Sequence, residues 1–126
     1  MVKFFYAGKS LEELQKMSMN EFAKLVDSRA RRYLKRAPMQ YRKLLKKISK
    51  IGGKKPIKTR CRDAVILPSW VGLTFAVHNG KFYKEIKITP EMIGRRLGEF
   101  SHTTGRVIHS GPGVGATRGS KFLPLK

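Results

Sequence analysis

Apolar residues at helical spacing mark the first part of the chain. Ser10 with Glu13 and Ser18 with Glu21 have the spacing of a capping box, in which two side chains satisfy free backbone amides at a helix start. After the second box, the apolar residues that recur every three or four positions are Phe22, Leu25, Val26, Ala30, Tyr33, Leu34 and Ala37. This pattern predicts an amphipathic helix.

A further helix is predicted after Pro38, because proline suits the first turn of a helix. Its apolar stripe consists of Tyr41, Leu44, Leu45, Ile48 and Ile51. Gly52 and Gly53 then indicate its end. Both helices are two-sided, with one apolar face and one densely basic face.

The pattern changes to β after residue 63. Residues 64–67 are apolar, and two further strand-like runs, 73–78 and 81–88, flank Asn79-Gly80, a strong hairpin signal. A two-residue loop would pair Val77 with Phe82 and Leu73 with Ile86. The face expected in the core is then formed by Leu73, Phe75, Val77, Phe82, Ile86 and Ile88, interrupted by Lys84.

A last short helix is predicted from Thr89, which can cap it. Pro90 suits its first turn, and Glu91 favours the positive end of the helix dipole. Met92, Ile93 and Leu97 give this helix an apolar side.

Charge decides the class of partner. The 126 residues contain 28 Lys and Arg against 8 Asp and Glu, a formal net charge of +20. Residues 29–62 hold fifteen of these cations and no acid. Such a density repels itself unless a polyanion lies nearby, and nucleic-acid phosphates supply one. No apolar run approaches the length of a membrane span, which makes a membrane surface the weaker alternative.

Other chemistry finds little support in the sequence. Residues 111–115 are glycine-rich but lack the ending and the context of a phosphate loop. No metal-ligand spacing connects His78, His102, His109 and Cys61, so neither a metal nor another cofactor is expected. The single cysteine excludes an internal disulfide and fits a reducing compartment. No nucleophile with a matching base stands out, so we do not expect an enzyme.

Four segments together resemble a known family. Residues 54–60, 66–68, 71–81 and 88–100 are similar to the universal S19 family of small-subunit ribosomal proteins. The spacing from Asn79-Gly80 through Ile88 and Gly94 to residues 97–100 is the most specific part. Arg95 departs from the pattern, since many relatives carry His there. Residues 109–118 and 121–126, like the helices before Arg36, are similar to the archaeal and eukaryotic branch, and we expect an archaeal source.

The resemblance implies an α+β fold with a small, mainly antiparallel sheet packed against helices. It divides a single domain into an N-terminal helical region (1–53), a family core (54–103) and an extended tail (104–126). It also implies a cytoplasmic location in the head of the small subunit, on the 3′ major domain of its rRNA. A neighbour of the S13 family is implied, as is a tail directed toward the decoding region and A-site tRNA.

Charge and resemblance together select the residues expected to contact RNA. Those expected to neutralise phosphates are Lys54, Lys55, Lys58, Arg60 and Arg62. Those expected at the hairpin tip are His78, Asn79 and Lys81, with the surface extended by Arg95, Arg96 and His102. The tail residues expected near the decoding region are Arg106, His109, Arg118 and Lys121. We expect the tail to become ordered on assembly.

Several alternatives remain open on the residues alone. The hairpin tip could be a plain turn, and Trp70 and Phe75 could stack bases, although core packing is the better interpretation. A DNA-compacting, chromatin-like protein is the rival function, because attraction to phosphate does not distinguish RNA from DNA. An RNA-modifying enzyme would need a site that the sequence does not display.

Overall fold

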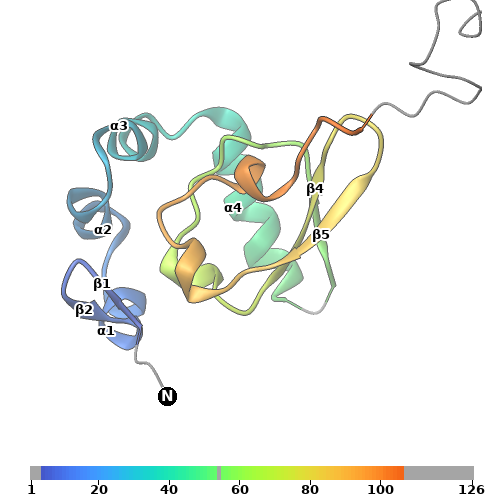
Figure 1. Cartoon of the computed structure of the whole chain (residues 1–126). Coiled ribbons are helices and arrows are strands. Elements are labelled where there is room, and N and C mark those ends of the chain that lie inside the picture. Colours follow the sequence, from blue (N-terminus) through green and yellow to red (C-terminus); the bar gives the residue numbers. More distant parts are fainter. Residues whose placement is uncertain (1–3, 54, 107–126) are drawn as a thin grey trace, which may run out of the picture.

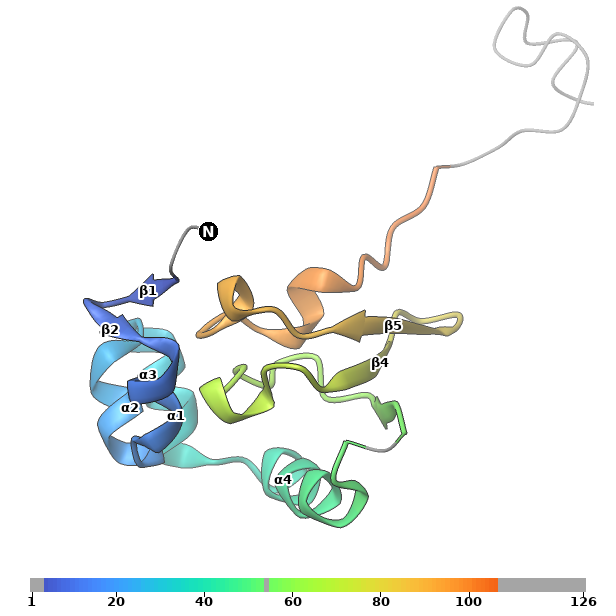
Figure 2. The same ribbon diagram turned by 90° about the horizontal axis from the view of Figure 1, so that it is seen from below.

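The computed structural model describes residues 4–53 and 55–106, which form an α+β fold (Figure 1). The strands are β1 (Phe5–Tyr6), β2 (Lys9–Ser10), β3 (Ile57–Thr59), β4 (Thr74–His78) and β5 (Tyr83–Lys87). The helices are α1 (Leu11–Lys16), α2 (Met19–Leu25), α3 (Ser28–Arg36) and α4 (Met39–Ile51). Both views place α1–α3 at one end and the β4–β5 turn at the other, with α4 between them (Figure 2).

Both predicted capping boxes are confirmed. The Ser10 backbone amide donates to Glu13 Oε2 at 3.0 Å, and the Glu13 amide donates back to Ser10 Oγ. Ser18 and Glu21 repeat the arrangement at the start of α2. The small β1–β2 hairpin that precedes α1 was not predicted, because each of its strands has only two residues.

The helix predicted after Ser18 is in fact two helices. The helical pattern breaks between Leu25, where α2 ends, and Ser28, where α3 begins. Arg31 stabilises the break: its Nε donates to the Ala23 carbonyl, and its Nη2 donates to the carbonyls of Lys24 and Val26. A guanidinium thus satisfies carbonyls that the helix end leaves without an intrahelical donor.

The predicted hairpin is present, but its register is shifted. The Asn79 amide donates to the Phe82 carbonyl at 3.1 Å, so the turn centres on Gly80 and Lys81, one residue later than expected. Ile86 therefore pairs with Phe75 and not with Leu73. A shift of the turn by one residue moves the pairing by two and preserves the inward face.

The sheet has the order β3-β4-β5, with β3 parallel to β4 and β4 antiparallel to β5. The apolar run 64–67 forms no regular strand. It is held against residues 94–97 instead, through a bridge between Val65 and Arg96 and neighbouring backbone hydrogen bonds. The last predicted helix is replaced by two 3-10 turns, Pro90–Met92 and Leu97–Phe100, separated by Gly94 at a φ of +81°.

A row of aromatic rings connects the helices to the sheet. Tyr33 on α3 packs edge-on against Tyr41 on α4, with ring centroids 5.3 Å apart. Tyr41 is followed by Trp70 at 6.0 Å and Trp70 by Phe75 at 5.1 Å. Tyr41, Trp70 and Phe75 are at most 2% exposed. Trp70 and Phe75 are therefore core residues and cannot stack bases in this fold.

Candidate nucleic-acid interface

The first basic feature is a groove between α4 and β3. Lys43 and Lys47 lie one helical turn apart on α4, which buries Tyr41 and Leu44 in the core. The groove has a volume of about 330 Å³ and is lined by Gln40, Lys43, Leu44, Lys47, Lys58, Thr59, Arg60 and Cys61. Three lysines and one arginine thus surround a concave surface with no carboxylate among the lining residues.

Strand β3 and the residue after it connect the groove to the β4–β5 hairpin. Its alternation turns Ile57 and Thr59 inward and leaves Lys58 exposed, as the two-residue period of a strand requires. Lys58 Nζ lies 5.8 Å from the centre of the Tyr83 ring, and Arg60 Nε donates to Tyr83 Oη at 3.4 Å. Tyr83, which the sequence analysis missed, therefore connects two predicted phosphate ligands to β5.

The hairpin tip is organised by its own side chains. Asn79 Oδ1 accepts hydrogen bonds from the amides of Lys81 and Phe82, and His78 Nδ1 accepts one from the Gly80 amide. These acceptors are used within the turn. Lys81 and Phe82 point outward, and the Phe82 side chain is 57% exposed. The tip thus presents a cation beside an aromatic ring, although sequence analysis had selected only the cation.

Arg62 occupies a different environment from the other predicted phosphate ligands. Its Nη1 donates to the His78 carbonyl, and its Nη2 donates to the carbonyls of Gly98 and Ser101. These bonds fix the segment before His102 against the hairpin, so that His102 and Arg106, both exposed, follow directly from it. A contact between Arg62 and RNA stays a prediction, while the observed donors hold the fold together.

Replacing Arg62 by methionine is expected to lower the free energy of unfolding by about 2–4 kcal/mol, because hydrogen bonds to a charged donor contribute about 1.5–3 kcal/mol each and do not add fully. Urea unfolding of the free protein measures the change. The matched control is Arg60→Met, which removes the same charge from an exposed position two residues earlier. Equal stability of the two variants would contradict the structural role of Arg62.

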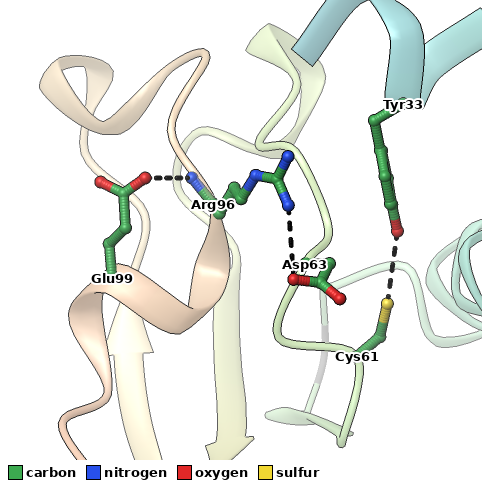
Figure 3. A network of polar contacts seen from close by, with 5 residues as sticks. All are labelled: Tyr33, Cys61, Asp63, Arg96 and Glu99. Atoms are coloured by element: carbon green, nitrogen blue, oxygen red, sulfur yellow. Dashed lines mark hydrogen bonds and ion pairs between the residues drawn. The ribbon is translucent and has the colours of Figure 1, made fainter. Parts of the chain in front are cut away.

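Arg95 and Arg96 point to different surroundings. Arg95 Nη1 lies 3.7 Å from Glu99 Oε2 on the exposed surface. Arg96 Nη1 lies 3.3 Å from Asp63 Oδ1, and its guanidinium sits over the Tyr33 ring, 5.6 Å from the centroid. Figure 3 shows Arg96 between the Glu99, Asp63 and Tyr33 side chains. The predicted contact residues therefore divide between the hairpin end and the side of the molecule that faces α3.

Four predicted contact residues lie outside the described residues, namely Lys54, His109, Arg118 and Lys121. Lys55 is described and exposed, next to the start of β3. The structure thus brings Lys58, Arg60 and His78 together around Tyr83, places Lys81 and His102 near them, and separates Arg96 from this group.

The phenol groups near the interface are held in their neutral form. Burial raises the pKa of Tyr33, and the hydrogen bond between Tyr33 Oη and Cys61 Sγ (3.6 Å, Figure 3) adds to the increase. Burial likewise raises the pKa of Tyr41, with a smaller effect from Cys61. Tyr33 therefore offers a ring and a hydroxyl, and no charge, to its surroundings.

Neither a metal-binding cluster nor a membrane-spanning helix is present in the described part of the chain. Among residues 4–53 and 55–106, no group of three or more His, Cys, Asp or Glu side chains is arranged to hold a metal ion. In the same ranges, none of the helices combines the length and the apolar character needed to cross a bilayer.

Comparison with known proteins gave consistent matches. The sequence model of the family described as ribosomal protein S19 matches residues 31–109. The chain is similar to the small ribosomal subunit protein uS19 of Thermoplasma acidophilum, with 52% identity over 125 residues. The uS19 protein of Picrophilus torridus is 52% identical over the same length. Each alignment covers 98% of this chain and 82% of the relative.

Proposed function

Because the chain belongs to the ribosomal protein S19 family, in its archaeal branch, and is a protein of the small ribosomal subunit, we propose that it binds the rRNA of that subunit as a structural component. The protein would then act in the cytoplasm, as part of the assembled small subunit. The role requires no catalytic step, and we assign none to its side chains.

The observation that carries the proposal is the series of exposed cations between α4 and the hairpin tip. It begins with Lys43 and Lys47, continues through Lys58 and Arg60, and reaches Lys81 past Tyr83. Lysines act as point charges that can follow a phosphate backbone. Lys47 Nζ also donates to the Lys58 carbonyl, which connects α4 to β3. Exposed aromatic rings at the tip, Phe82 and Tyr83, add surfaces on which unpaired bases can stack.

The finer placement is part of the same proposal. We place the protein in the head of the subunit, on the 3′ major domain of the rRNA, beside a protein of the S13 family. The tail would reach toward the decoding region and A-site tRNA. Its residues from 107 onward lie outside the described residues, and Arg106, the last described residue, is exposed.

The test is sedimentation of a cell extract through a gradient at high salt, with the protein followed by antibody. We expect the protein to travel with the small subunit, because a structural component is held by its fit to folded RNA as well as by charge, and only the charge contribution weakens with salt. Recovery at the top of the gradient, above intact subunits, would contradict a structural role and indicate a loosely bound factor.

The preference of the protein for rRNA over DNA is tested by a separate measurement. Purified protein is titrated with a head-domain rRNA fragment and with duplex DNA of equal length at one salt concentration. Tighter binding to rRNA is expected, since folded RNA offers unpaired bases to the hairpin tip as well as phosphates. Equal affinities would favour the DNA-compacting alternative.

A further inference from the structure

Helix α3 concentrates arginines on one face. Arg29, Arg32 and Arg36 follow the spacing i, i+3, i+7, which places them in one row along the helix. The opposite face buries Ala30 and Leu34 in the core. Among the described residues, these three arginines form neither an ion pair nor a side-chain hydrogen bond within the protein, in contrast to Arg31, which is turned back onto α2.

The row of arginines borders a concave site. A cavity of about 310 Å³ is lined by Arg29, Arg32, Tyr33, Arg36, Pro38 and Arg96, and we call it the arginine pocket. Four of its six lining residues are arginines, and none is acidic. The pocket lies on the side of the molecule occupied by α3, whereas the hairpin tip lies at the opposite end (Figure 1).

Arg96 closes the pocket from a distant part of the chain. Its Nη1 is held 3.3 Å from Asp63 Oδ1, while Tyr33 supports the guanidinium from the side of α3 (Figure 3). Asp63 offsets only this one charge. Three guanidiniums remain uncompensated around the cavity, which therefore has the electrostatics of an anion site that is already assembled.

The residue types in the pocket identify the ligand more closely than the charge does. The groove beside α4 uses mainly lysine, which suits a passing backbone. The arginine pocket uses only arginine as its cation, and the planar fork of arginine binds phosphate oxygens in pairs and stacks on bases. Tyr33 and Pro38 supply apolar walls that a phosphate does not need and a base does.

We propose that the arginine pocket holds one unpaired, extrahelical nucleotide of RNA, with its phosphate on Arg29, Arg32 and Arg36 and its base against the Arg96–Tyr33 wall. This inference rests on the proposed function, because the nucleotide belongs to the rRNA that the protein binds. It adds a second point of attachment, far from the hairpin, that recognises a splayed base and not a duplex.

The test compares nucleotide-resolution chemical probing of a head-domain rRNA fragment bound to the full chain and to Arg32→Ala/Arg36→Ala. The wild-type protein should protect one unpaired base. The double variant should leave that base reactive, retain the remaining footprint, and bind roughly tenfold or more weakly, since base stacking and a bidentate phosphate contact are both lost. Both substituted side chains are exposed, so the fold should persist.

Two matched variants distinguish recognition of the nucleotide from a general effect of positive charge on RNA binding. Lys16→Ala/Lys24→Ala removes the same charge from exposed positions on α1 and α2 and should leave the base protected. Arg32→Lys/Arg36→Lys keeps the charge and loses the fork geometry, so protection of the base should fall although overall affinity is largely kept.

Each remaining outcome overturns a defined claim. An unchanged footprint in Arg32→Ala/Arg36→Ala, or protection lost along a paired stem, would overturn the nucleotide site and leave the proposed function intact. If Arg32→Ala/Arg36→Ala preserved the RNA footprint but released an acidic protein neighbour from reconstituted subunits, the arginine pocket would bind a protein instead of a nucleotide. Failure of the wild-type chain to protect rRNA at all would overturn the proposed function itself.

Discussion

Raising the salt concentration fourfold is expected to weaken rRNA binding by about four to five orders of magnitude. The reason is counterion release: if about ten phosphates are neutralised, log K falls with log salt at a slope near roughly −7 to −9. Seven of the fifteen cations in the basic segment 29–62 line the α4–β3 groove and the arginine pocket, and Arg96 and Lys81 add two more, which brings the total close to ten. Titrations between 50 and 200 mM salt, the range over which such losses are typical, measure the slope.

The same titration examines individual residues. Lys58→Ala/Arg60→Ala should lower the magnitude of the slope by about 2, since each lost phosphate contact removes about one unit. Lys16→Ala/Lys24→Ala, which removes equal charge at the other end of the molecule, should keep the wild-type slope. A slope near zero for the wild-type chain would refute phosphate neutralisation as the source of affinity. Equal slopes for the two double variants would remove Lys58 and Arg60 from the interface.

Replacing Trp70 by alanine is expected to lower the free energy of unfolding by about 3–5 kcal/mol. Trp70 is 2% exposed and stands between Tyr41 on α4 and Phe75 on β4, so its removal opens a cavity where helix and sheet meet. A loss of that size is a large part of the roughly 5–15 kcal/mol that stabilise a typical domain. Urea unfolding followed by far-UV circular dichroism measures the change.

Trp70→Phe serves as the conservative control, because it retains a ring between the same two neighbours and should be less destabilising than alanine. An average point substitution destabilises a protein by about 1 kcal/mol. A loss for Trp70→Ala below that value would show that the aromatic row does not hold the helices and the sheet together. Measurements at several salt concentrations are needed, since the +20 net charge destabilises the free protein most at low salt.

Local chemistry explains which parts of the fold could be predicted. The capping boxes at Ser10 and Ser18 depend on residues three positions apart, and both were found where the sequence placed them. The break between α2 and α3 depends on Arg31 reaching carbonyls five to eight residues earlier. The parallel pairing of β3 with β4 joins segments on either side of the 64–67 run. Neither feature leaves a periodic signal in the sequence.

The hairpin shows how a local rule can fail by one residue. Asn79-Gly80 was expected to occupy the centre of the turn, but the Asn79 side chain accepts from two following amides and moves the centre to Gly80 and Lys81. The inward face was nevertheless predicted, because the resulting two-residue shift conserves the alternation. Phe82 was the exception: it was assigned to the core and is exposed in the turn.

For the candidate interface, the sequence predicted which cations contact RNA but not how they are grouped in space. Charge and family resemblance selected Lys58, Arg60 and Lys81 but not Tyr83, which contacts Arg60 through its hydroxyl and Lys58 through its ring. Arg29, Arg32 and Arg36 were counted within the basic segment without being assigned a site. Their helical spacing could have revealed the row, but the approach of Arg96 from sixty residues further along the chain could not be read from it.

The two arginines that bind carbonyls, Arg31 and Arg62, have a consequence for which sequences can fold into this structure. Each guanidinium reaches three carbonyls at once, and the single ammonium of lysine lacks that fork. Substitution of lysine by arginine should therefore be tolerated along the groove beside α4. The reverse substitutions Arg31→Lys and Arg62→Lys should lower the free energy of unfolding, although the net charge is unchanged. The basic segment thus contains two populations of cations with different mutational tolerance, and a charge count alone does not separate them.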